Sequence, residues 1–85
     1  MPQSERSSII IQFLRWLQGR CKAKNYPNIQ ECVKHIEIEI TSMGATRKRA
    51  ISYVKSCESA GLIHRYGLKF KISKDGENWL QKKIL

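Results

Sequence analysis

The fold is decided by one stretch of the chain, Thr41-Ser-Met-Gly-Ala-Thr-Arg-Lys-Arg-Ala-Ile-Ser-Tyr-Val-Lys-Ser-Cys-Glu-Ser-Ala-Gly-Leu-Ile63. Thr46 can cap a helix here, because its hydroxyl can accept a free backbone N–H of the first turn. Gly61 supplies the left-handed residue at which such a helix ends without a Cβ penalty. Apolar residues recur between them at three- and four-residue steps and so share one face: Ala50, Val54, Cys57 and either Tyr53 or Ala60.

The opposite face of this predicted helix is cationic. A helix that is buried on one side and carries cations and small hydroxyls on the other suits the floor of a DNA major groove, where Arg and Lys can pair with guanine. The alternative is a solvated charged face without a ligand. The residues of the cationic face are Arg47, Lys48, Ser52, Lys55 and Ser56, with Arg49 and Ile51 at its edges.

The composition of the chain points to a small domain with an anionic partner. It has 85 residues, 41% of them hydrophobic, which is enough for a single domain over residues 1–85. Its formal net charge is +9, from 16 Lys and Arg against 7 Asp and Glu. Such an imbalance indicates nucleic acid or an acidic membrane surface, the alternative being a merely basic protein. The basic residues are concentrated in residues 47–71, which hold a single acid, Glu58.

Membrane and disulfide signals are weak. No run of residues approaches the length of a membrane span, and the N-terminus lacks the apolar core of a signal peptide. We therefore expect an intracellular protein, cytoplasmic and nucleoid-associated, without membrane contact. Three cysteines without close pairs do not form a disulfide framework. Cys32 and Cys57 fall on apolar faces and are expected to be small core residues, unless a hyperthermophilic source favours a bridge.

Two further helices are predicted before the basic one. Ser4 can cap the first, with residues 1–4 frayed, and Gly19 is a fitting end for it. Asn28-Ile-Gln-Glu31 has the form of a capping box, so a second helix begins there. The apolar stripes are Ile10, Phe13, Leu14 and Leu17 in the first helix, widened by Ile9 and Trp16, and Ile29, Cys32 or Val33, Ile36 and Ile40 in the second.

One segment of the second helix gives a mixed signal. Residues 36–40 alternate between apolar and acidic, as a half-buried strand would. The cap before them and the turn after them favour a helix, and Ile38, which does not fit the helical stripe, marks its end.

A short hairpin and a last helix are predicted after the basic helix. Residues 62–65 and 68–73 flank Tyr66-Gly67, where Gly permits a tight turn. Ser73 can cap the last helix, whose first turn is acidic, as its dipole favours. The second strand directs Leu68, Phe70 and Ile72 one way and Lys69 and Lys71 the other; the last helix carries Trp79, Leu80, Ile84 and Leu85 as its apolar residues.

This order of elements resembles the winged helix-turn-helix family, which implies an α+β, mainly α fold of three helices, a short two-stranded wing and a C-terminal helix. Residues 46–63 resemble the recognition helix and exit strand of MarR- and PadR-like regulators, which commonly end in Gly-Leu-Ile, here Gly61-Leu62-Ile63. Phe70-Lys-Ile-Ser-Lys-Asp-Gly76 resembles the aromatic-x-Leu-Thr-x-x-Gly segment that closes their wing. The resemblance covers roughly residues 8–82. In size the chain is similar to minimal winged-helix proteins of archaea and their viruses and plasmids.

The resemblance implies a transcription regulator that binds double-stranded DNA sequence-specifically. Its third helix would lie in the major groove, and its short basic wing would contact the backbone. The wing cations have an alternative role as edge-strand charges that prevent aggregation. The implied DNA-binding residues are Thr46, Arg47, Lys48, Arg49, Ile51, Ser52 and Lys55 in the recognition helix, and Arg65, Lys69 and Lys71 in the wing.

Apolar residues in the first and last helices exceed what one small core needs, which favours a homodimer. Each of these residues could instead complete the core of the monomer. The candidate dimer surface consists of Ile9, Trp16, Trp79, Ile84 and Leu85.

Catalysis has little support in the sequence. The acids are scattered, without a carboxylate pair, and no Gly-rich phosphate loop is present. Cys32 and His35 could face a metal from one helix, but no second ligand pair follows at zinc-like spacing. We therefore expect no enzyme activity, metal, cofactor or small-molecule ligand.

Two alternative functions are compatible with the same pattern. The first is a winged helix used as a protein-interaction module in a transcription or replication assembly, which would bind an acidic partner instead of duplex. The second is a chromatin or replication protein that binds DNA without sequence preference. Binding to random and genomic duplexes at two salt concentrations separates these possibilities.

Overall fold

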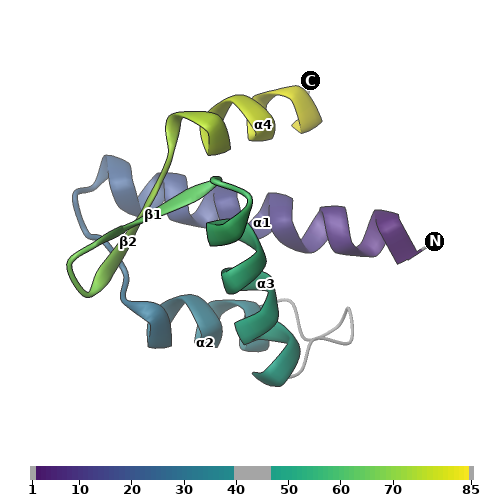
Figure 1. Ribbon diagram of the computed structural model, residues 1–85, viewed down its shortest axis with the longest axis horizontal. Coiled ribbons are helices and arrows are strands. Elements are labelled where there is room, and N and C mark those ends of the chain that lie inside the picture. The colour runs from purple at the N-terminus through teal and green to yellow at the C-terminus, as the bar shows by residue number, and fades with distance from the viewer. Residues whose placement is uncertain (1, 40–46, 85) are drawn as a thin grey trace.

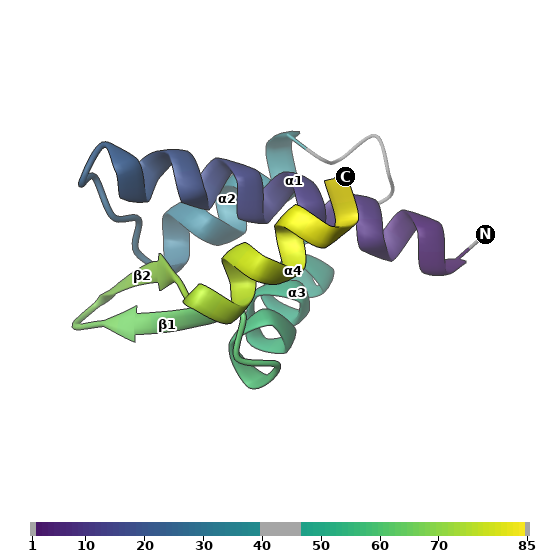
Figure 2. The same ribbon diagram turned by 90° about the horizontal axis from the view of Figure 1, so that it is seen from above.

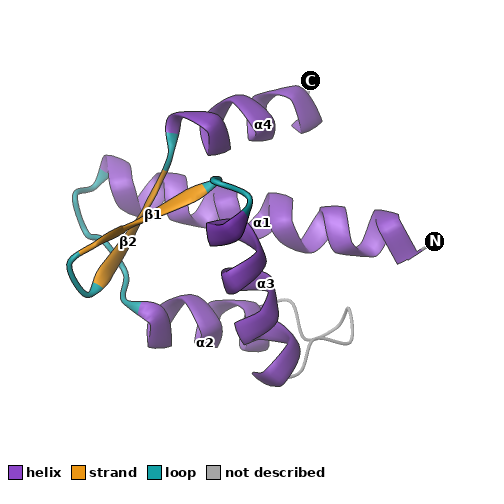
Figure 3. Cartoon of the chain, viewed as in Figure 1, coloured by secondary structure: helices purple, strands orange, loops and turns teal. Residues whose placement is uncertain are grey.

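The computed structural model describes the backbone of residues 2–39 and 47–84 and the side chains of residues 8–38 and 47–83. The described residues form an α+β fold that is mainly helical, as predicted, with four helices and one antiparallel two-stranded sheet (Figure 1 and Figure 3). The elements are, in order, α1 (Pro2–Lys22), α2 (Ile29–Glu39), α3 (Arg47–Ser59), β1 (Ile63–Tyr66), β2 (Lys69–Ile72) and α4 (Lys74–Ile84).

Helix α1 is the element against which most of the others pack. It contacts α2, α4 and β2, whereas α3 contacts α2 and β1. In Figure 1, α2 and α3 lie below α1, and α4 lies above it. Figure 2 shows the hairpin of β1 and β2 at the end of the molecule where α1 ends, with its turn pointing away from α4.

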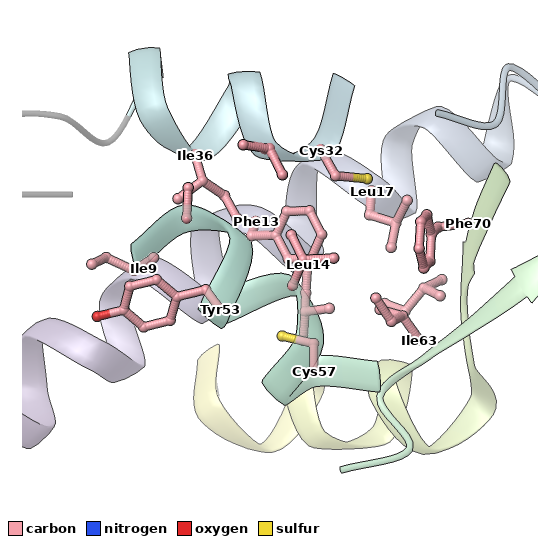
Figure 4. Close-up of a cluster of buried hydrophobic side chains, with 14 of the residues drawn as sticks. Ile9, Phe13, Leu14, Leu17, Cys32, Ile36, Tyr53, Cys57, Ile63 and Phe70 are labelled. Carbon is pink, nitrogen blue, oxygen red and sulfur yellow. The ribbon is translucent and has the colours of Figure 1, made fainter. Parts of the chain in front are cut away.

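The apolar stripes of these elements meet in one hydrophobic core (Figure 4). Each fully buried Leu, Ile or Phe side chain there contributes about 2 kcal/mol of transfer free energy. Ile9 is fully buried and Ile10 only half-buried, so the stripe of α1 begins one residue earlier than predicted. Tyr53, and not Ala60, completes the stripe of α3. The core consists of Ile9, Phe13, Leu14, Leu17, Cys32, Val33, Ile36, Ala50, Tyr53, Val54, Cys57, Ile63, Phe70, Ile72 and Leu80.

Helix α1 is longer than predicted at both ends. The prediction of Ser4 as the cap was wrong, because the helix begins at Pro2. Proline fits a first helical position, where no N–H is needed. The predicted end at Gly19 was also wrong, because the helix continues to Lys22.

A left-handed residue that is not glycine ends α1. Lys24 has a φ of 55°, its N–H donates to the carbonyl of Cys21 at 3.0 Å, and the N–H of Asn25 donates to the carbonyl of Arg20 at 2.9 Å. These two bonds form a Schellman motif, which satisfies the last carbonyls of the helix. A glycine inside a helix costs only about 1 kcal/mol. The extra turn packs Cys21 against the core. The free energy gained from this burial outweighs the cost of keeping Gly19 inside the helix.

The predicted capping box at the start of α2 is confirmed. The N–H of Glu31 donates to Oδ1 of Asn28 at 2.9 Å, and the N–H of Asn28 donates to Oε2 of Glu31 at 3.0 Å. Two backbone donors that the helix cannot satisfy are thereby satisfied by side chains.

The alternating segment at the end of α2 is helical through Glu39, as predicted. Ile38 is exposed on the outer face, and the helix ends one residue after it, at Glu39. Residues 40–46, which include the predicted cap Thr46 and the predicted turn, lie outside the described residues.

The predicted end of α3 at a glycine is confirmed. Gly61 has a φ of 76°, and its N–H donates to the carbonyl of Glu58 at 3.0 Å. The N–H of Leu62 donates to the carbonyl of Cys57 at 2.9 Å, which completes a second Schellman motif. The chain leaves this motif directly into β1, so the position of the hairpin is fixed by the end of α3.

The turn of the hairpin lies one residue later than predicted. Tyr66 belongs to β1 and pairs with Lys69, so the turn consists of Gly67 and Leu68. Gly67 has a φ of 65° at the first central position, as a type II′ turn requires. Leu68 is therefore at the tip and is 89% exposed, and the prediction that it points inward with the other apolar residues of β2 was wrong.

A third segment of the chain pairs with the hairpin. Asn28 forms an isolated bridge with Lys69, and the N–H of Phe70 donates to the carbonyl of Pro27 at 2.8 Å. Strand β2 therefore lies between β1 and the residues that precede α2.

The predicted cap of the last helix is confirmed. Oγ of Ser73 accepts the N–H of Gly76 at 2.8 Å and donates to the carbonyl of Gly61 at 2.6 Å. The N–H of Ser73 donates to the carbonyl of Leu62 at 3.0 Å. The start of α4 is thereby tied to the end of α3.

Candidate nucleic-acid interface

The outer face of α3 is a basic surface supported by a buried stripe. Ala50, Tyr53, Val54 and Cys57 are buried on the inner side of the helix. The predicted recognition residues fall on the other side: Arg47, Lys48, Arg49, Ser52 and Lys55 are exposed, and Ile51 and Ser56 are half-buried. We call these seven residues the α3 face.

The cations at the start of the α3 face differ in their contacts. Within the described side chains, the ion pairs are Arg20–Glu31 and Arg65–Glu58, so no described carboxylate neutralises Arg47 or Lys48. Arg49 is held sideways instead. Its Nη2 donates to the hydroxyl of Tyr53 at 3.3 Å, and its guanidinium carbon lies 6.0 Å from the centroid of that ring.

Two shallow hollows adjoin this surface. One, of about 420 Å³, runs along the α3 face itself and includes Lys48, Ser52 and Lys55 in its lining. The other, of about 430 Å³, lies between α2 and the start of α3 and includes Lys34 and Arg47. Both hollows are open; the first is lined by cations and serines with one apolar residue, Ile51, whereas the second also contains Glu37, Val33 and Ile38.

The predicted wing cations lie on opposite faces of the hairpin. The register pairs Arg65 with Phe70 on the side that faces the core, and the Arg65 guanidinium carbon lies 5.1 Å from the Phe70 ring centroid. Its Nε also donates to Oε2 of Glu58 at 2.7 Å. Arg65 therefore braces the hairpin against α3.

Lys69 and Lys71 lie on the outward side of β2. Lys69 is exposed, whereas Lys71 is half-buried, with its Nζ 4.8 Å from the ring centroid of Tyr66 and 5.2 Å from that of Tyr26. The structure thus brings Lys69 and Lys71 together and separates them from Arg65.

Three residues of the hairpin surface were not selected from the sequence: Tyr26, His64 and Tyr66. Tyr66 was assigned to the turn, and Tyr26 lies in a loop that approaches β2 only through the pairing of residues 27 and 28. The sequence feature that could have identified these residues is the alternation of aromatic and basic residues along the chain, which is typical of nucleic-acid surfaces.

The three candidate dimer residues whose side chains the structure describes do not form one surface. Ile9 is fully buried and belongs to the core of the monomer, which agrees with the alternative prediction for this residue and not with a dimer contact. Trp16 stacks on His35 of α2 with centroids 4.3 Å apart and planes at 10°, whereas Trp79 lies on α4, on the other side of α1 (Figure 1). The side chain of Ile84, and Leu85 as a whole, lie outside the described residues.

Cys32 and His35, the two residues of α2 considered as possible metal ligands and not predicted to bind one, lie in different surroundings. Cys32 is fully buried in the core, and this burial raises the pKa of its thiol to about 12. His35, one turn later on α2, lies flat against Trp16. Among the side chains that the structure describes, no group of three or more His, Cys, Asp or Glu is arranged to hold a metal ion.

The comparisons with known proteins give no relative for this arrangement. No family model, no curated protein and no solved structure matches the chain. In the part of the chain that the structure describes, no helix has the length and apolar character needed to cross a membrane.

Proposed function

We propose that the chain is a winged helix-turn-helix protein that binds double-stranded DNA sequence-specifically and acts as a transcription regulator. The observation that carries this proposal is the α3 face, whose leading cations Arg47 and Lys48 are exposed and unpaired with any described carboxylate. The order of helices and hairpin is compatible with the winged-helix layout.

In this proposal each part of the α3 face has a separate role. Arg47 and Lys48 read guanine edges in the major groove, which is wide enough to admit a helix. Ile51 can contact a thymine methyl group. Arg49, which is held against Tyr53, is suited to gripping a phosphate, which positions the protein without reading sequence.

A homodimer is part of the proposal, because paired half-sites raise affinity for DNA. Its support is that Ile10 and Ile11 on α1 and Trp79 on α4 are only half-buried at the edge of the core, so apolar surface remains on both helices. A solution mass of twice 9.9 kDa is the result expected, and a monomer at all concentrations would remove this part of the proposal.

Duplex binding by single-charge variants tests the proposal. Arg47→Ala and Lys48→Ala are expected to reduce the discrimination between a selected sequence and random duplex, each by about tenfold, since a good base contact is worth about 1–3 kcal/mol. Lys69→Ala is expected to weaken both duplexes equally, because phosphate contacts carry no sequence information.

Lys82→Ala is the matched control, since Lys82 is an exposed cation on α4, away from the α3 face, and its removal changes the net charge by the same amount. It should leave binding to both duplexes nearly unchanged. Equal losses on specific and random duplex for Arg47→Ala and Lys69→Ala would contradict the assigned roles. No duplex binding by the unaltered protein would favour a protein-interaction module.

A further inference from the structure

The outward side of the hairpin carries aromatic and basic side chains together. Strand alternation places His64, Tyr66, Lys69 and Lys71 on this side, opposite the buried Ile63, Phe70 and Ile72. The segment that pairs with the other edge of β2 adds Tyr26. We call His64, Tyr66, Lys69, Lys71 and Tyr26 the wing face.

The centre of the wing face is two tyrosine rings that share one ammonium group. The ring centroids of Tyr26 and Tyr66 are 5.6 Å apart, with planes tilted by 51°. Nζ of Lys71 lies 4.8 Å from one centroid and 5.2 Å from the other, which is within the range of cation–π attraction. These contacts favour the rotamers that keep both rings beside Lys71 before any ligand arrives.

The aromatic surface of the wing face is open to solvent. Tyr66 is 58% exposed at the end of the last strand pair, and the neighbouring tip residue Leu68 is also exposed. The ring of Tyr66 is not needed to stabilise the hairpin, because Phe70 and its neighbours already fill the side of the hairpin that faces the core. A large ring held by a cation and left uncovered is suited to stacking a planar ligand.

The charges around the rings favour an anionic ligand. Lys69 and Lys71 flank Tyr66 on the same side of the sheet. Glu31 lies within electrostatic reach of Lys69, but it already accepts hydrogen bonds from the N–H of Asn28 and from Arg20. Cations therefore predominate beside an uncovered aromatic ring.

We propose that the wing face binds unpaired nucleotides of single-stranded DNA, with one base stacked on Tyr66 and adjacent phosphates on Lys69 and Lys71. Stacking on an aromatic side chain needs a base with a free face, and the bases of an intact duplex are already stacked on each other. An acidic peptide would satisfy the lysines but would leave the ring without a planar partner.

This inference goes beyond the proposed duplex binding and does not depend on it. Lys69 of the wing face can meet a phosphate of either ligand, whereas Tyr66 stacks only on an unpaired base and the α3 face contacts only a duplex. A protein with both surfaces would bind a duplex that has an adjoining unpaired segment more tightly than a blunt duplex, because the two contacts act on one ligand.

Fluorescence anisotropy of a labelled short oligothymidylate tests the inference with the full chain. Tyr66→Ala should weaken binding about tenfold, since stacking is worth about 1–3 kcal/mol per base, whereas Tyr66→Phe should bind like the unaltered protein because it keeps the ring. Tyr66→Leu, which keeps apolar bulk without a planar ring, should resemble Tyr66→Ala and guards against loss of fold in the alanine variant.

Two arms separate this inference from the alternatives. Arg47→Ala should leave oligothymidylate binding unchanged even where it weakens duplex binding, so the two sites can fail independently. Oligoglutamate should compete only weakly with the labelled oligothymidylate for the protein. Equal oligothymidylate affinity in Tyr66→Ala, Tyr66→Leu and the unaltered protein would overturn the inference. Tight oligoglutamate binding with the same dependence on Tyr66 would also overturn it, in favour of an acidic peptide.

Discussion

At the scale of single residues, Gly76 is held to glycine by a backbone contact. A Cβ at this position would overlap the carbonyl oxygen of Leu62, and that oxygen is also fixed by the N–H of Ser73. This oxygen belongs to the backbone, so it cannot move aside as the end of a flexible side chain could. We expect Gly76→Ala to lower the free energy of unfolding by about 3 kcal/mol, at the upper end of overpacking costs.

Gly19→Ala is the matched control for this prediction. Gly19 lies inside α1, and a Cβ there would have no atom within 4 Å. Alanine is the better helix former, so this variant should be stabilised by about 0.5–1 kcal/mol. Urea unfolding of both variants measures the two effects. A Gly76→Ala protein as stable as Gly19→Ala would show that α4 does not approach Leu62 so closely.

At the scale of elements, the cap of α2 gives stability a pH dependence. The pKa of Glu31 is lowered, first by the N–H of Asn28 and then by the side chain of Arg20, with burial opposing. A carboxyl whose folded pKa lies below its ordinary 4.5 stabilises the fold above that pH and loses this contribution as the pH falls. Glu31→Gln keeps an acceptor for the cap but cannot titrate.

The unaltered protein should therefore exceed Glu31→Gln in stability near neutral pH, and the difference should shrink as the pH falls below 4.5. Thermal unfolding of both proteins across that range provides the measurement. A difference that is constant with pH would mean that the charge of Glu31 contributes nothing to the cap.

The elements also show which features of the fold could be predicted from sequence. Helix α3 and its cationic face were predictable, because its stripe and the terminating Gly61 lie within one contiguous segment. The end of α1 was not, because Lys24 takes the left-handed conformation that glycine usually provides. The turn of the hairpin was displaced by one residue, since its register depends on burying Ile63 opposite Ile72.

The wing face could not be predicted for a related reason. Tyr26 and Tyr66 are distant in sequence, and only the pairing of the segment before α2 with β2 brings their rings together. Local periodicity carries no information on such a contact. The split of Arg65 from Lys69 and Lys71, by contrast, follows from strand alternation alone, because Arg65 lies opposite Phe70 and so faces the other side of the sheet.

At the scale of the whole molecule, the net charge of +9 has an uneven spatial distribution. Within the described residues, Glu58 and Glu31 are each engaged with an arginine. The cations of the α3 face and Lys69 of the wing face are exposed to solvent, on elements joined directly by the chain after Gly61. A field of one sign over α3 and the hairpin raises the rate and the affinity of binding to a polyanion.

Salt dependence measures how many of these cations meet phosphates. Each phosphate neutralised on duplex DNA contributes about −0.9 to the slope of log K against log salt concentration, because condensed counterions are released. Lys69→Ala should therefore reduce the magnitude of the slope by about 1 on any duplex, whereas Lys82→Ala on α4 should leave it unchanged. Anisotropy titrations of random duplex over a series of salt concentrations give the slopes. If Lys69→Ala lost affinity with an unaltered slope, Lys69 would act through the shape of the hairpin and not through a phosphate, and the basic wing would have to be removed from the proposed interface.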